Sequence, residues 1–209
     1  MIDFPESTKT NRRIPKEAFY KHLSLSTALK SKFVSDISRI VAENSLTQRN
    51  LNLAKDSEIK EILLLSIELK KQDYEQRIIE AIAKGNPHKL VFLMSYEDQR
   101  QLAVYYQKLY LTEWILEEKV ELHLSGDNLE DIWNGLVRQI AIGPDAQSRS
   151  NMSLDDQLSR LDEIRQLQQR IKKLEKAVWG ETQPKKKFAL YQDLKKQKEQ
   201  LEVLERGQA

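Results

Sequence analysis

A run of leucine and isoleucine residues at three- and four-residue spacing dominates the last third of the chain. The run comprises Leu154, Leu158, Leu161, Ile164, Leu167, Ile171, Leu174 and Val178. Nearly all intervening positions are charged residues or glutamine, so the pattern predicts one long helix with a single apolar stripe. Trp179, Gly180 and Pro184 interrupt this pattern, which resumes at Leu190, Leu194, Leu201 and Leu204. Since two lone apolar stripes need each other for burial, residues 153–209 are predicted to form a coiled-coil-like antiparallel helical hairpin.

The preceding residues, 16–142, carry the alternating signals of a small α/β domain. Helical apolar spacing or capping predicts helices over 16–22, 26–43 and 74–84, and one more after Gly126 that begins at Asp127 or Asn128. Apolar runs rich in isoleucine, leucine, valine and aromatic residues predict strands over 61–69, 88–95, 100–107 and 110–116. This order predicts an α/β (α+β) fold with a small mixed sheet flanked by helices.

Two segments lie outside these units. Residues 1–15 are predicted to form an extended basic arm, because Pro5 and Pro15 oppose helix and the polar residues between them show no apolar period. Residues 143–152 have the composition of a linker. The sequence therefore predicts an arm, a domain, a linker and a hairpin, in that order.

The composition excludes several classes of site. The chain of 209 residues has no cysteine, so a disulfide, a thiolate zinc site and a thiol nucleophile are excluded, and a cytoplasmic location is favoured. The N-terminus lacks the apolar core of a signal peptide, and the longest apolar runs are much shorter than the ~20 residues of a membrane span. We therefore expect no membrane association.

The net charge of +2 is too small to indicate nucleic-acid binding, so any such indication depends on local clusters of basic residues. One cluster lies in the arm and the other at the predicted hairpin turn. The candidate nucleic-acid-binding residues are Arg12, Arg13, Lys16, Lys172, Lys173, Lys176, Lys185, Lys186 and Lys187. Trp179, Phe188 and Tyr191 lie among the second group and could stack on bases. The structural alternative is a solvated turn whose aromatic residues hold the two helices together.

A catalytic alternative depends on Glu68 and Lys70, which have Glu-x-Lys spacing at the end of a predicted strand. Restriction-type nucleases use such a strand to hold a divalent metal, and Asp56 and Glu68 would then be the ligands of Mg²⁺ and Lys70 the charge stabiliser. The other interpretation is an exposed strand end with solvated charges. The histidines show no metal-binding spacing and no glycine-rich nucleotide loop follows a strand, which lowers the expectation of an enzyme. Outside the nuclease alternative, we predict no cofactor.

Several segments together resemble a known bacterial family. They are NRRIPKEAFY, LKSKFVSDISRI, EILLLSIELK, KLVFLM, AVYYQK and KKKFALYQDLKKQKEQLEVL. Over nearly the whole chain they resemble the family catalogued as domain of unknown function 4391. The resemblance implies an accessory protein of bacteria and archaea, often encoded beside helicase and DNA-methyltransferase genes of restriction or phage-defence type. It also implies that relatives often have an apolar or small residue at the position of Glu68.

We therefore expect a non-enzymatic accessory component of a bacterial DNA-processing or antiviral defence complex, similar to restriction–modification assemblies. The hairpin would bind a protein partner, such as the helicase or methyltransferase of a defence system, and the basic segments would contact DNA. Two alternatives stay open, namely the metal-dependent nuclease and a self-associating structural protein whose hairpins pair into a homo-oligomeric bundle.

Overall fold

A computed structural model describes residues 2, 4–23, 25–144 and 152–206. The chain divides into two compact units, residues 1–144 and residues 145–209. Most of the predicted linker, residues 145–151, lies outside the described residues. No helix among the described residues is long and apolar enough to cross a membrane.

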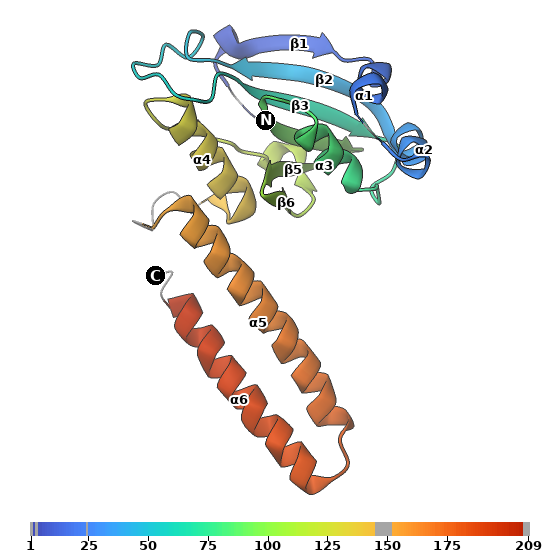
Figure 1. The fold of residues 1–209 in the computed structure, drawn as a ribbon, viewed down its shortest axis with the longest axis vertical. Helices are drawn as coiled ribbons and strands as arrows, with labels where there is room; N and C mark the ends of the chain where they lie inside the picture. Colours follow the sequence, from blue (N-terminus) through green and yellow to red (C-terminus); the bar gives the residue numbers. More distant parts are fainter. Residues whose placement is uncertain (1, 3, 24, 145–151, 207–209) are drawn as a thin grey trace. The chain divides into compact units, whose positions relative to one another are not determined.

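The first unit is built on a seven-stranded sheet of order β1-β2-β3-β4-β5-β6, with β7 paired to β5 (Figure 1). The strands are Lys9–Arg13 (β1), Ile37–Leu46 (β2), Ile62–Leu69 (β3), Lys89–Tyr96 (β4), Gln99–Tyr106 (β5), Lys108–Leu111 (β6) and Ile115–Leu116 (β7). All pairs are antiparallel except β3–β4, which are parallel and joined by the helix Arg77–Lys84 (α3). The predicted mixed sheet is therefore confirmed.

Helices cover both faces of this sheet. Phe92 and Met94 of β4 belong to the main core, together with Ile78, Ile79 and Ile82 of α3. This core also contains Phe33 of the helix Thr27–Asp36 (α2), with Phe19 of the helix Lys16–His22 (α1) packed against it. Lys89, whose side chain leaves β4 on the face opposite to that of Leu90, lies 5.5 Å from the ring centre of Trp133. Trp133 belongs to the helix Leu129–Ala141 (α4), so α4 covers the second face.

The helix predicted over 26–43 is wrong in its second half. Ser26 caps α2 as expected, since its hydroxyl accepts a hydrogen bond from the Leu29 amide at 3.3 Å. The helix ends at Asp36, however, and the next ten residues form β2 between β1 and β3. Ile37 and Ile40 fit a helical period, but they are fully buried in the strand as well. Because their apolar spacing suits either conformation, pairing with β3 decides between helix and strand.

The N-terminal segment contains the short 3₁₀ helix Glu6–Thr8 (η1) and then β1, which is the edge strand of the sheet. The backbone of β1 is extended and pairs with β2 across a register shift between Lys9 and Arg12. Asn11, between them, has φ of 46°, as expected at an irregular position. The charged side chains and the irregular register are features that protect sheet edges from pairing with other chains.

The second unit is the predicted antiparallel hairpin, formed by the helices Leu154–Gly180 (α5) and Pro184–Arg206 (α6) (Figure 1). Ser153 caps α5 by accepting a hydrogen bond from the Asp156 amide. The apolar seam comprises Leu167, Ile171 and Leu194, with Leu174, Val178, Leu201 and Leu204 packed against them. The guanidinium of Arg160 donates to the Leu204 carbonyl oxygen at 2.7 Å and so caps the end of α6.

Candidate functional site

The hairpin turn is short and locally determined. α5 ends at Gly180, and Pro184 begins α6, a position where proline needs no amide hydrogen. Glu181 bridges the turn, because its carboxylate accepts a hydrogen bond from the Gln183 amide at 2.8 Å. The turn therefore brings the last residues of α5 beside the first residues of α6.

Six lysine side chains gather at this end of the hairpin, and all of them are exposed. They are Lys172, Lys173 and Lys176 on α5 and Lys185, Lys186 and Lys187 on α6. None of the six forms an ion pair with any residue that the structure describes. Farther along α6, by contrast, Lys198 lies 2.7 Å from Glu175 and Lys195 lies 3.9 Å from Glu199. The turn thus has a concentration of positive charge that the hairpin itself does not neutralise.

Three aromatic side chains at the same end of the hairpin are also exposed. Trp179 is 88% exposed, Phe188 64% and Tyr191 55%, and none of them belongs to the apolar seam. The turn is therefore solvent-exposed, as the structural alternative expects, but its aromatic residues are not part of the seam between the two helices. Exposed aromatic rings beside unpaired lysines are the groups that stack on bases and bind phosphates.

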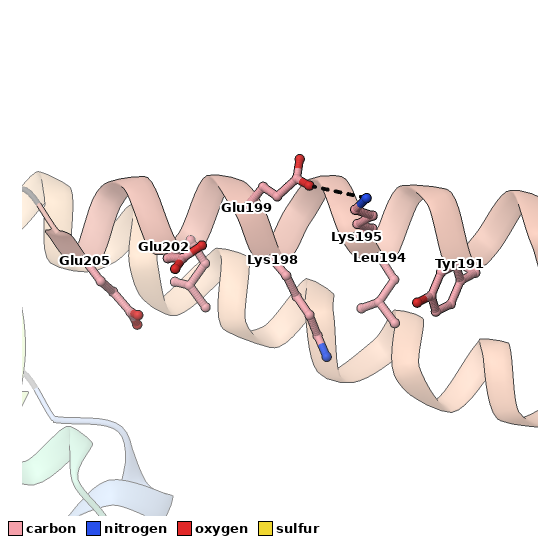
Figure 2. A pocket seen from close by; sticks show the side chains of 8 residues that line it. Tyr191, Leu194, Lys195, Lys198, Glu199, Glu202 and Glu205 are labelled. Carbon is pink, nitrogen blue, oxygen red and sulfur yellow. Dashed lines mark ion pairs between the residues drawn. The ribbon is translucent and has the colours of Figure 1, made fainter.

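Two grooves follow the sides of the hairpin. One, of about 440 Å³, is lined by α6 alone, and Figure 2 shows its side chains, including Tyr191, Leu194 and Lys198. The other, of about 600 Å³, lies between α5 and α6 and contains Leu167 and the 71% exposed Val203. Both grooves combine apolar floors with charged walls, which suits a helical protein partner.

The predicted basic residues of the N-terminal segment differ in their contacts. Arg12 and Arg13 are exposed on the edge strand β1. The Lys16 ammonium, by contrast, donates a hydrogen bond to the Ile37 carbonyl oxygen. Burial, and then the positive charge of Lys70, lowers the pKa of Lys16. Arg12 and Arg13 are therefore the accessible cations of this segment, whereas Lys16 also stabilises the junction of α2 and β2.

The residues of the nuclease alternative lie at separate places. Asp56 precedes β3 and lies 3.1 Å from Lys60, and the Ser57 amide and Lys60 hold its pKa below the usual value. Glu68 lies near the other end of β3, and Ile62 to Glu68 alone span roughly 20 Å of strand. Lys70 donates to the Val34 carbonyl oxygen of α2 at 3.0 Å, so it acts as a C-terminal cap of that helix. The structure therefore does not bring these three residues together, and no cluster of three or more candidate metal ligands occurs among the described residues.

Glu68 instead lines a polar hollow of about 650 Å³ in the first unit. Arg39 lies 3.7 Å from Glu68, and Arg100 lies 2.6 Å from Glu117, so each arginine in the hollow has a carboxylate partner. Sequence reasoning did not identify Arg39, Arg100 or Glu117, because these residues come from β2, β5 and the turn after β7 and no local motif connects them. Only the strand pairing places them in one hollow.

The two units define a class of protein, namely an α/β domain with a mixed sheet that is followed by a helical hairpin. Within that class, the chain belongs to the family described as Domain of unknown function (DUF4391), whose model matches residues 2–201. The match includes both units and confirms the resemblance seen in the sequence. No curated protein and no solved structure matches the chain.

Proposed function

We propose that the protein is a non-enzymatic accessory component of a bacterial DNA-processing or antiviral defence assembly, in which the α5–α6 turn contacts nucleic acid. The observation that carries this proposal is the set of six exposed lysines, which form no ion pair with the residues that the structure describes, beside three exposed aromatic rings. Lysines that bind phosphates release condensed counterions, and this release drives binding. The defence context comes from the family resemblance alone.

The aromatic residues support single-stranded nucleic acid as the ligand. A ring that is 88% exposed, such as that of Trp179, can stack on an unpaired base, whereas stacked bases inside a duplex present no free face. Phe188 and Tyr191 offer further stacking positions three residues apart on α6. The protein partner would use the hairpin flanks, where leucine side chains floor the two grooves.

The test is a salt titration of the affinity for fluorescently labelled single-stranded and duplex DNA, measured by anisotropy. Changing Lys185, Lys186 and Lys187 to alanine should reduce the slope of log K against log[salt] by about 2 for single strands, at roughly 0.7 per phosphate contact. Changing Trp179 to alanine should weaken single-strand binding by about 5- to 150-fold, with little effect on duplex.

A matched control removes the same charge elsewhere. Lys55, Lys60 and Lys84 each pair with a carboxylate in the first unit, and changing all three to alanine should leave the slope unchanged. Equal slopes for the wild type and the variant of the turn would refute the proposed contact. An equal loss of slope in both triple variants would show that only net charge matters.

A further inference from the structure

Two of the three exposed aromatic rings lie on one face of the hairpin. Glu175 of α5 and Lys198 of α6 lie 2.7 Å apart, so this ion pair marks a face that both helices share. Trp179 follows Glu175 by four residues, and residues four apart lie on the same side of a helix. Tyr191 precedes Lys198 by seven residues, or two helical turns, and Figure 2 shows both side chains on the same side of α6. Trp179 and Tyr191 therefore project from neighbouring helices on the same face.

The two rings also lie at a similar level along the hairpin. Counted from the Glu175–Lys198 pair toward the turn, Trp179 is four residues along and Tyr191 seven, or roughly 6 Å and 10 Å of helix. Each aromatic side chain leans along its helix in the same direction as the charged one, so the rings differ in level by only about 5 Å. The axes of packed helices are roughly 8–10 Å apart, and two rings that enclose one base need about 7 Å, twice the ~3.4 Å spacing of stacked bases. The spacing of the two helices therefore suits one base.

Exposed lysines flank the two rings on the same face. On α5, Lys172 lies seven residues before Trp179. On α6, Lys187 lies four residues before Tyr191, on the side of the rings that is closer to the turn. Neither lysine forms an ion pair with a residue that the structure describes. The face therefore combines two stacking surfaces with a free cation on either side of them.

Phe188, the third exposed ring, points elsewhere. Tyr191 precedes the seam residue Leu194 by three residues and lies about 60° around the helix from it. Phe188 precedes Leu194 by six residues and lies about 120° around. Phe188 is thus turned farther away from α5, on the outer side of α6, and does not face a base that contacts Trp179.

We propose that Trp179 and Tyr191 enclose one unpaired base of a DNA strand between their rings, while Lys172 and Lys187 bind the phosphates on either side of that base. This inference rests on the proposed nucleic-acid contact and narrows its ligand to a base that is free on both faces. Such a base occurs in a flexible single strand, or in a duplex that contains one extra nucleotide. Because every base has an aromatic face, the site recognises an unstacked base rather than a sequence.

The test measures the affinity of the full chain, at one low salt concentration, for a perfect duplex and for the same duplex with one extra unpaired nucleotide. The wild type should bind the second probe at least about fivefold more tightly, by fluorescence anisotropy. W179A and Y191A should each remove most of this difference. The double variant should bind little more weakly than either single variant, because one ring alone no longer encloses the base.

Two matched controls stay on α6. Y191F keeps the ring and should bind like the wild type, and F188A, which removes an equally accessible ring outside the pair, should change the affinity for the second probe by less than about twofold. Circular dichroism should show equal helix content in all variants, because Trp179, Phe188 and Tyr191 are exposed and lie outside the seam.

Three results would overturn the enclosed base. They are equal affinities of the wild type for the two duplexes, losses in W179A and Y191A that multiply in the double variant, and a loss in F188A as large as that in Y191A. The proposed function is judged by a different measurement, the salt slope for single strands when the lysines of the turn are changed. A normal lysine-dependent slope together with equal affinities for the two duplexes would therefore refute this inference and leave the proposed contact intact.

Discussion

Asp36 connects three elements of the first unit, and its replacement should therefore destabilise the sheet domain. Its side chain is fully buried and accepts hydrogen bonds from the Ser35 hydroxyl at 2.6 Å and the Glu75 amide at 2.9 Å. The Lys71 ammonium lies 3.0 Å from the same carboxylate, and the Lys70 amide donates to the Asp36 carbonyl oxygen. One carboxylate thus joins the end of α2, the end of β3 and the segment that leads into α3.

The expected cost of Asp36→Asn follows from these contacts. Hydrogen bonds to a charged group contribute roughly 1.5–3 kcal/mol each. In the asparagine variant, however, water can solvate the partly exposed Lys71 ammonium, and the asparagine side-chain oxygen still accepts one hydrogen bond. We therefore expect a loss of about 2–3 kcal/mol in the free energy of unfolding, and about 3–4 kcal/mol for Asp36→Ala, which leaves the Glu75 amide without an acceptor.

The pH dependence of the free energy of unfolding tests whether the negative charge of Asp36 is the source of this stabilisation. Burial alone would raise the pKa of Asp36, but the hydrogen bonds from Ser35 and Glu75 and the charge of Lys71 outweigh it and lower that pKa below its usual value. A group whose pKa is lower in the folded state stabilises the fold above its unfolded pKa, about 3.9. The stabilisation by Asp36 should be constant from about pH 5 to 8 and should disappear as the pH falls through the folded pKa.

Urea denaturation followed by tryptophan fluorescence is the suitable measurement. Trp133 is 2% exposed and reports on the first unit, whereas Trp179 is already 88% exposed and should be replaced by phenylalanine in every variant. Asp56→Asn is the control, because Asp56 is an exposed carboxylate that also has a lowered pKa. A difference between wild type and Asp36→Asn that is as large at pH 3 as at pH 7 would refute this reasoning.

Two further predictions concern the hairpin. The side-chain oxygen of Gln197 is buried without a hydrogen-bond partner among the described residues. Gln197→Leu should therefore stabilise the hairpin by about 1–2 kcal/mol and raise its unfolding midpoint in thermal circular dichroism. A lower midpoint would show that the amide has a role in the seam. Arg160→Ala removes the donor to the Leu204 carbonyl oxygen. Backbone amides in the last helical turn of α6 should then exchange about fivefold faster in hydrogen-exchange measurements. The exchange rates of amides near the α5–α6 turn should not change.

The elements that the sequence predicted well have local signals. The hairpin follows from its apolar period and the Ser153 cap, and the start of α4 follows from Asn128, whose side chain accepts a hydrogen bond from the Asp131 amide at 2.9 Å. By contrast, β2 could not be predicted, because Ile37 and Ile40 satisfy a helical period as well as a buried strand. Only pairing with β3, which is distant in the sequence, selects the strand.

The candidate site shows the same division between local and non-local information. The lysines of the turn were predicted because they are adjacent in the sequence, but the exposure of the aromatic residues depends on which residues form the seam. Val178 packs in the seam, and Trp179, about 100° farther around the helix, consequently points away from it. Lys70 could not be assigned to the end of α2 from its Glu-x-Lys spacing, because its partner is the Val34 carbonyl oxygen.

The distribution of charge along the hairpin distinguishes its turn from the rest of α6. Towards the middle of α6, lysines and glutamates alternate in blocks and pair within the hairpin, as Lys198 does with Glu175, so little repulsion remains there. At the turn, six lysines lie close together without a paired carboxylate among the described residues, and their mutual repulsion opposes folding. A hairpin that served only as a spacer would gain stability from glutamates at these positions. The unneutralised turn therefore supports the proposed anionic ligand.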